Sequence, residues 1–228
     1  MIVFIGDIHG EFGQLNSFMN EFYSKHKEPI TFIICGDVAY FWLNEPTPII
    51  KRPPYSKIIW IPGNHENWEM VDTYELGKLH ELQDGVFMAS FGAIEEIEGH
   101  KIMFCGGAES IDKNLRTPFI DWFPQEIITN KDMNFLFDEI PIQKIDILVS
   151  HTCPQRVFPH LSKKIEWLEE RSSDPSVYAL DIIVDKFNPN LCVFGHFHRF
   201  TEGNISDMMF TCLSYIYSNR IYYKILKT

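Results

Sequence analysis

Short apolar runs recur along the chain, and polar residues or glycines follow them. They are rich in β-branched and aromatic side chains: Ile2–Ile5, Ile30–Cys35, Ile58–Ile61, Ile145–Val149 and Leu191–Phe194. Runs of four to six such residues, without polar alternation, are typical of strands that are buried on both faces of a sheet. The pattern therefore predicts a protein built around buried strands.

Two longer segments carry apolar residues at helical spacing instead. The first places them at Phe12, Leu15, Phe18, Met19 and Phe22, and the second at Val177, Leu180, Ile183, Val184 and Phe187. Spacings of three and four residues give a helix one apolar face. Asp174-Pro175, ahead of the second segment, resembles an N-cap followed by proline at the first helical position. We predict helices in both segments.

Two further segments are predicted to form hairpins. In the first, Ala93–Ile97 and Lys101–Cys105 flank Gly99-His100, and in the second, residues 208–213 and 220–226 flank Ser218-Asn219. Strand-rich segments added to a start in which strands and helices alternate indicate two packed sheets with helices outside. No repeat, low-complexity tract or linker interrupts the pattern, so we expect one domain over residues 1–228.

The net charge of the chain limits which molecules it is expected to bind. The formal net charge is −11, which disfavours a basic surface that grips long nucleic acid. It leaves small phosphorylated substrates open, because bound divalent metals can be the largest local charges in a site. The sequence makes no prediction about the oligomeric state.

Other features of the sequence indicate the cellular compartment of the protein. No apolar run approaches the roughly 20 residues of a membrane span, and the first five residues lack a basic leader and a cleavage site. The cysteines are five in number and include no CxxC pair, which does not resemble a disulfide framework. We expect a cytoplasmic protein that does not bind membranes.

Metal-binding side chains follow each of the five apolar runs. The strings are Gly6-Asp7-Ile8-His9-Gly10, Gly36-Asp37, Gly63-Asn64-His65-Glu66, Ser150-His151 and Gly195-His196-Phe197-His198. In an extended segment, alternate residues such as His196 and His198 share one face. Any one string alone is weak, but oxygen and imidazole donors together suit Mn, Fe, Zn or Ni. Their convergence would make a metal site.

These five strings resemble the motif set of the calcineurin-like metallophosphoesterases, from Asp7 to His198. The resemblance implies an α/β fold, a four-layer α/β/β/α sandwich of two mixed sheets flanked by helices. It also implies two divalent metal ions, of which manganese is the first choice and Fe, Zn or Ni are alternatives. The implied ligands of one metal are Asp7, His9 and His198, those of the other are Asn64, His151 and His196, and Asp37 bridges the two.

The resemblance further implies a hydrolytic mechanism. Two metals about 4 Å apart can each bind a phosphate oxygen and share a hydroxide, whose pKa they lower, so that it attacks phosphorus near neutral pH. His65 follows the implied ligand Asn64 directly and is the candidate general acid, since an imidazole titrates near neutral pH. His65 and Asp37 are thus the predicted catalytic residues.

The chain departs from the serine/threonine phosphatase branch of that family after Asp37. Tyr40 stands where that branch has an aspartate that pairs with the catalytic histidine, and Phe41 stands where it has a phosphate-clamping arginine. Phenylalanine offers no donor to a phosphate. The group that orients His65 must come from elsewhere, and the candidates near it in sequence are Glu66, Glu69 and Asp72.

Substrate contacts are expected from residues 106–116, which follow a predicted strand and mix glycines with Lys113 and Arg116. This string and Trp122-Phe123-Pro124-Gln125-Glu126 resemble segments of small bacterial and phage metallophosphoesterases. Arg116 could replace the missing clamp, and Lys113 and Asn64 are further candidates for contact with the phosphate.

Three functions remain in view. The first is hydrolysis of a small phosphomonoester by the two-metal centre, and the second is a phosphodiesterase that acts on cyclic nucleotides or nucleic-acid ends. The third is a scaffold that kept the fold and lost catalysis, since fold alone does not imply activity. Retention of His65 and of every implied metal position favours an enzyme.

Overall fold

A computed structural model gives the structure of the protein and describes residues 1–41, 48–165, 168 and 172–226. The first sheet contains β1 (Ile2–Ile5), β2 (Thr31–Ile34), β3 (Lys57–Trp60), β4 (Leu79–Gln83), β5 (Val86–Ala89) and β12 (Tyr223–Leu226). Its strand order is β12-β1-β2-β3-β5-β4, and the two edge strands run antiparallel to four parallel ones.

The second sheet repeats this plan. It contains β6 (Ala93–Ile97), β7 (His100–Cys105), β8 (Ile147–Ser150), β9 (Leu191–Phe194), β10 (Thr201–Ile205) and β11 (Met208–Cys212). Its order is β10-β11-β9-β8-β7-β6, and β7, β8, β9 and β11 are mutually parallel. The five buried runs of the sequence correspond to β1, β2, β3, β8 and β9, so those predictions are confirmed.

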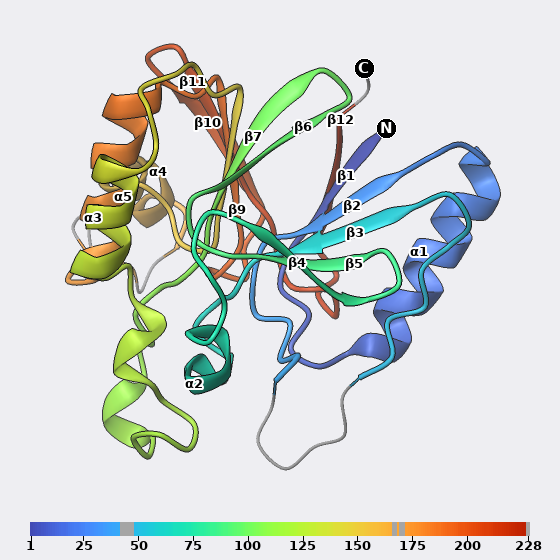
Figure 1. The fold of residues 1–228 in the computed structure, drawn as a ribbon, viewed down its shortest axis with the longest axis horizontal. Helices are drawn as coiled ribbons and strands as arrows, with labels where there is room; N and C mark the ends of the chain where they lie inside the picture. The colour runs from blue at the N-terminus through green and yellow to red at the C-terminus, as the bar shows by residue number, and fades with distance from the viewer. Residues whose placement is uncertain (42–47, 166–167, 169–171, 227–228) are drawn as a thin grey trace.

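Helices cover the outer faces of both sheets (Figure 1). They are α1 (Phe12–His26), α2 (Trp68–Val71), α3 (Asn130–Asp138), α4 (Phe158–Ser162) and α5 (Pro175–Phe187), with short 3-10 helices η1 (Lys113–Leu115), η2 (Pro124–Glu126) and η3 (Gln155–Val157). Helix α1 lies on the first sheet, and α3, α4 and α5 lie on the second. Both helices expected from the apolar spacing are present, and Asp174 accepts a hydrogen bond from the Ser176 N–H as the expected N-cap of α5.

Three apolar cores separate the four layers. One lies between α1 and the first sheet, where Leu15 and Met19 meet Phe32, and one lies between α5 and the second sheet. The third lies between the sheets and joins residues such as Phe4 and Phe104. Two mixed sheets flanked by helices confirm the predicted fold class. None of the helices in the described residues has the length and hydropathy of a membrane span.

The strand directions bring distant loops together. Since β1, β2 and β3 are parallel, their carboxyl ends meet at one edge of the first sheet, and β7, β8, β9 and β11 likewise end at one edge of the second. Ligands of open α/β sheets bind outside the carboxyl ends of the strands. All five metal-binding strings follow strands of these two sets.

The second predicted hairpin is wrong. Strand β11 pairs with β9 and β10 in the second sheet, whereas β12 crosses over and pairs antiparallel with β1 in the first. In this position the ring of Tyr223 packs on Phe18 and Phe22 of α1. The first hairpin, β6 with β7, is confirmed.

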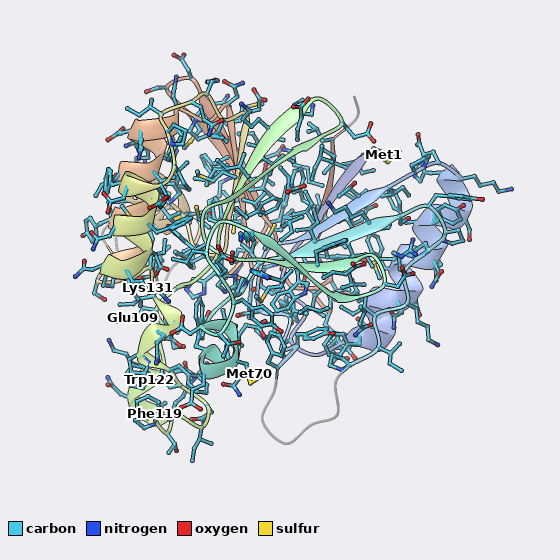
Figure 2. The ribbon with its side chains drawn as sticks, in the orientation of Figure 1. Met1, Met70, Glu109, Phe119, Trp122 and Lys131 are labelled. Carbon is cyan, nitrogen blue, oxygen red and sulfur yellow. The ribbon has the colours of Figure 1, made fainter. Side chains whose placement is uncertain are left out.

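The segment between β7 and α3 projects from the body of the protein below α3 and close to α2 (Figure 2, where Phe119 and Trp122 are labelled). It contains the 3-10 helices η1 and η2. A capping box formed by Thr129 and Asp132 begins α3, a helix that the sequence patterns did not predict. This segment carries Arg116 towards the strand ends.

Candidate metal centre

Four of the predicted ligands form one compact group. Asp7, His9, Asp37 and His198 each offer a donor atom, and these atoms lie within 4.8 Å of one another. Nε2 of His198 lies 3.1 Å from Oδ2 of Asp7, and Nε2 of His9 lies 3.7 Å from Oδ2 of Asp37. Two carboxylates and two imidazoles at this separation could hold a metal ion.

The other three predicted ligands meet on the other side of Asp37. Oδ1 of Asn64 lies 3.0 Å from Nε2 of His151 and 3.0 Å from Nδ1 of His196. Oδ1 of Asp37 lies 3.2 Å from the same nitrogen of His151. The structure therefore brings all seven predicted ligands together, and Asp37 contacts both groups.

The hydrogen bonds of His151 test whether a cation fits this second group. Its Nδ1 donates to the carbonyl oxygen of Cys35 at 2.8 Å. In the neutral imidazole, Nε2 is then a lone pair that faces the acceptor oxygens of Asn64 and Asp37. Three acceptor atoms then converge, and a cation, either a metal ion or a proton on His151, is needed to satisfy them. The donor set therefore fits a divalent metal ion.

Electrostatics at the centre favour positive charge in the same place. Burial lowers the pKa of His151, but the Asp37 carboxylate beside it outweighs burial and raises that pKa to about 9. Burial raises the pKa of Asp37, and the neighbouring His151 nonetheless lowers it well below its ordinary value. Without a metal, a proton on His151 serves as the counter-charge of the buried carboxylates.

His196 behaves in the opposite way. Burial, together with the nearby His151, lowers the pKa of His196 to about 3, so its ring is neutral at pH 7. A neutral ring keeps a nitrogen lone pair available as a ligand. Burial lowers the pKa of His198, but the hydrogen bond with Asp7 outweighs it and leaves that pKa raised.

The backbone at these loops is strained. His9, Asp37, His196 and His198 all have positive φ, between 48° and 65°. Non-glycine residues seldom adopt this conformation, and they persist in it where the surrounding structure over-determines them, often at functional sites. The backbone N–H of His196 donates to both oxygens of Asp7, each at 3.1 Å, which explains part of this constraint.

Two glycines allow the loops to approach this closely. A Cβ on Gly195 would collide with Oδ1 of Asp7, and a Cβ on Gly63 would collide with Oδ1 of Asp37 and approach Nε2 of His151. Neither position tolerates a side chain without displacement of a predicted ligand.

A buried hydrogen-bond chain orients Asn64, and the sequence patterns missed it. Nδ2 of Asn64 donates to Oγ of Ser110 at 3.1 Å, and that hydroxyl donates to Oε2 of Glu126 at 2.9 Å. Trp122 Nε1 also donates to Glu126, at 2.9 Å. The chain turns the amide so that its oxygen faces the histidines. Burial raises the pKa of Glu126 to about 7, against hydrogen bonds from Ser110 and Trp122 that lower it.

Glu66 forms no hydrogen bond with the ring of His65, although the sequence made it a candidate for orienting that residue. Its carboxylate accepts hydrogen bonds from the backbone N–H groups of Val38, Ala39 and Tyr40 at 2.7, 2.9 and 3.1 Å. It therefore supports the turn after Asp37 and does not orient His65. Glu69 and Asp72 are exposed.

Arg116 is the described side chain that contacts the ring of His65 most directly. Its Nη2 donates to Nε2 of His65 at 3.0 Å, while the backbone N–H of His65 donates to Oδ1 of Asp37 at 2.8 Å. Burial lowers the pKa of His65, and the charge of Arg116 contributes in the same direction against the pull of Asp37. Glu66, Glu69 and Asp72, the candidates near His65 in sequence, do not fill this role.

An open cavity of about 490 Å³ lies over the centre. Asp37, Asn64, His65, Arg116, His196 and His198 line it, together with Arg199 and aromatic side chains of Phe197 and Tyr215. Lys113 lies outside this lining. It pairs with Glu109 and faces an adjoining pocket of about 470 Å³.

A family model described as calcineurin-like phosphoesterase matches residues 1–200. No curated protein sequence matches the chain.

Several solved structures are similar in fold. GAP50, described as the anchor in the inner membrane complex of Plasmodium, is 13% identical, and the match covers 92% of this chain and 70% of that one with a TM-score of 0.52. Phosphopantetheinyl hydrolase from Mycobacterium tuberculosis is 17% identical over 94% of this chain and 89% of that one, with a TM-score of 0.47. An archaeal phosphodiesterase is 11% identical over 94% and 83%, with a TM-score of 0.40.

Proposed function

The chain belongs to the calcineurin-like phosphoesterase family, and on this premise we propose that it is a metal-dependent hydrolase of small phosphate esters. The observation that carries the proposal is the convergence of acceptor atoms from both sheets around Asp37. Asp7, His9 and His198 would hold one divalent ion, and a separate set of three residues would hold the other: Asn64, His151 and His196. Asp37 would contact both.

When bound, the two ions would act as Lewis acids on the phosphate and lower the pKa of a water near neutral pH. The chain itself supplies orientation. Ser110 fixes the amide of Asn64, and the N–H of His65 fixes the carboxylate of Asp37. Oxygen and nitrogen donors suit manganese, iron, zinc or nickel, and manganese is the first to test.

Arg116 and His65 would act on the substrate as a pair. A phosphate in the cavity competes for the guanidinium of Arg116, which binds phosphate oxygens through two N–H groups. As Arg116 turns to the phosphate, Nε2 of His65 loses its donor and gains an anionic neighbour that favours its protonated form. His65 can then give its proton to the leaving oxygen.

We also propose a cytoplasmic location for the protein. All five cysteines lie in the described residues and are free and buried, which supports a reducing compartment such as the cytosol.

The phosphodiesterase alternative rests on the aromatic wall of the cavity. Phe197 and Tyr215 line it next to the predicted ligands, and the ring of Tyr215 lies 4.8 Å from that of His198. An aromatic wall can bind an organic group on the far side of the phosphorus, which a diester carries. The scaffold alternative rests on GAP50, a protein of similar fold described as an anchor.

The test is manganese-dependent hydrolysis of p-nitrophenyl phosphate and of bis-p-nitrophenyl phosphate by the purified protein, with a chelator control. Turnover of the monoester that the chelator and Asp37→Ala abolish supports the proposal, and a preference for the diester supports the phosphodiesterase. No turnover of either ester by protein with bound manganese favours the scaffold.

The role of His65 has its own test on leaving groups of different acidity. Loss of general-acid catalysis costs about 10²- to 10⁴-fold, and it costs most where the leaving group is basic. His65→Ala should therefore slow phenyl phosphate more than p-nitrophenyl phosphate. An equal loss on both esters would contradict a proton-donating role.

A further inference from the structure

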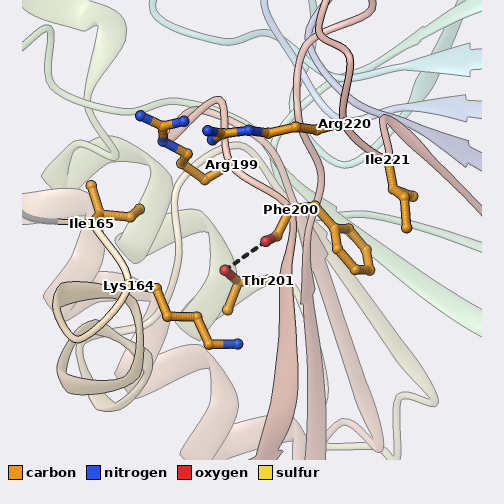
Figure 3. Close-up of a pocket in the computed structure, with 7 residues that line it drawn as sticks. All are labelled: Lys164, Ile165, Arg199, Phe200, Thr201, Arg220 and Ile221. Carbon is orange, nitrogen blue, oxygen red and sulfur yellow. Dashed lines mark hydrogen bonds between the residues drawn. The ribbon is translucent and has the colours of Figure 1, made fainter.

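A second pocket of about 650 Å³, drawn in Figure 3, shares Arg199 with the cavity of the metal centre. Three of its lining side chains are cationic: Lys164 after α4, Arg199 after β9 and Arg220 between β11 and β12. The other described lining residues are apolar or carry a hydroxyl group, so no carboxylate is among them. Figure 3 shows the guanidinium groups of Arg199 and Arg220 extending towards the same side of the pocket.

The two arginines of this pocket differ from the others that the structure describes. Arg52, Arg116 and Arg156 each contact a carboxylate, at distances of 2.5 to 2.8 Å. The side chains of Arg199 and Arg220 make no hydrogen bond or ion pair with any described residue, and neither does Lys164. These three cations therefore line one pocket without a counter-charge from the described chain.

Such a cluster is unexpected on a protein with a formal net charge of −11. Like charges in one pocket repel, and an anion between them removes that cost. A pair of guanidinium groups matches the oxygens of a phosphate, each through two N–H donors. The pocket thus has the charge and the donors that a phosphate group requires.

The pocket is joined to the metal centre through Arg199. This residue lines both cavities and directly follows His198, a predicted ligand. Ile165 and Ile221 also line the pocket and supply apolar surface that suits a short organic linker. One small molecule can therefore lie in both cavities.

We propose that the pocket of Lys164, Arg199 and Arg220 binds a second phosphate of the substrate, while the first phosphate lies at the metal centre. The preferred substrates are then small molecules that carry two phosphate groups. This inference rests on the proposed function for its catalytic part, and the pocket itself can be tested without catalysis.

The kinetic test uses a series of α,ω-alkanediol bisphosphates of increasing chain length, each compared with the monophosphate of the same diol. At the length that spans the two cavities, kcat/KM should be at least ~10-fold higher for the bisphosphate, since hydrogen bonds to charged groups are individually strong. Lys164→Gln and Arg220→Gln should each lower this ratio, whereas Lys25→Gln on α1, which removes the same charge elsewhere, should keep it. A ratio near one at every length would overturn the proposal.

The binding test uses the full chain after removal of metal by a chelator. Calorimetric binding of the best bisphosphate should weaken by ~10-fold or more in Arg220→Gln and in Lys164→Gln, and should not change in Lys25→Gln. If these two variants bind the bisphosphate more weakly but the wild-type protein hydrolyses no ester, the proposed function is refuted and the phosphate-binding pocket is supported. If the protein hydrolyses monophosphates but all variants bind the bisphosphate equally well, the phosphate-binding pocket is refuted and the proposed function is supported.

Discussion

At the scale of single residues, the direction of each donor and acceptor decides whether a metal can be held. The side-chain amide of Asn64 ends in an oxygen and a nitrogen, and only the oxygen can bind a metal ion. Ser110 accepts from Nδ2 and thereby presents Oδ1 to His151 and His196. Groups that orient a ligand in this way affect metal binding although they never touch the metal.

Ser110→Ala should therefore weaken binding of the metal on the Asn64 side by roughly 10- to 100-fold. Asn64 loses the acceptor that fixes its amide, and its nitrogen can turn towards the histidines. Manganese titration followed by calorimetry measures the change. Ser90→Ala is the matched control, because Ser90 is also buried and donates to the Glu75 carbonyl away from the site. Equal effects of the two variants would contradict an orienting role.

The raised pKa of Glu126 predicts that the free energy of unfolding depends on pH. Burial raises its pKa from an ordinary 4.5 to about 7, so the folded protein binds this proton more tightly than the unfolded chain does. Its contribution to stability is complete below about pH 4.5 and is lost as pH rises through about 7. The loss is roughly 3 kcal/mol at most.

The measurement is denaturant unfolding of metal-free protein from pH 4.5 to 8, for the wild type and Glu126→Gln. The free energy of unfolding of the variant should rise relative to that of the wild type as pH increases, because glutamine acquires no charge. A difference that stays constant with pH would show that Glu126 does not titrate in this range.

The sequence predicted seven metal ligands that the structure brings together, but not the residues that form hydrogen bonds with them. Asp7 and His198 follow strands and belong to recognisable strings, whereas the bond from Asn64 to Ser110 spans 46 residues and has no local signature. Arg116 was predicted as a phosphate clamp, and its contact with His65 across 51 residues was not. Partners of this kind are defined only by tertiary packing.

At the scale of elements, the site depends on sharp turns after parallel strands. Asp37 and His196 have φ of 48° and 65°, and the glycines before the ligands allow backbone and carboxylate to approach. Gly195 has Oδ1 of Asp7 where its Cβ would be. The turn after β9 is therefore built around Asp7, a predicted ligand in the turn after β1.

Gly195→Ala should displace Asp7 and lower manganese affinity by at least ~10-fold, while the protein still folds. Gly13→Ala is the control, because Gly13 lies in α1 with open space where a Cβ would be added, and alanine there should add about 0.5 to 1 kcal/mol of stability. Calorimetry and thermal unfolding of both variants check the pair. Unchanged metal affinity in Gly195→Ala would contradict the close approach.

Elements with a strong apolar pattern were predicted, whereas the pairing partner of the edge strand β12 was not. The central strands are fully buried and appear as continuous apolar runs. Strand β12 is only partly buried along its length, and in its pairing with β1 the ring of Tyr223 packs on α1. An edge strand carries too little pattern to reveal which sheet it joins.

At the scale of the whole molecule, the centre connects the two sheets. Asp7, Asp37 and Asn64 follow strands of the first sheet, whereas His151 and His196 follow strands of the second. A metal ligated from both sides would hold the sheets together, and the unfolded chain has no such site. Metal binding should therefore stabilise the entire fold.

Thermal unfolding should show this coupling. At free manganese of 100 times the dissociation constant, each site adds ~2.7 kcal/mol, which raises Tm by roughly 5 to 10 °C for a chain of this size. The comparison is between chelator-treated protein with and without added manganese. Asp37→Asn should lose most of the increase, because Asp37 contacts both groups of ligands.

The number of metal ions bound per chain tests the central claim most directly. Calorimetric titration of manganese into chelator-treated, dialysed protein should give two ions per chain, and Asp37→Asn should weaken both. A stoichiometry of one would contradict a two-metal centre that shares Asp37. Failure to bind any divalent metal would contradict the account as a whole.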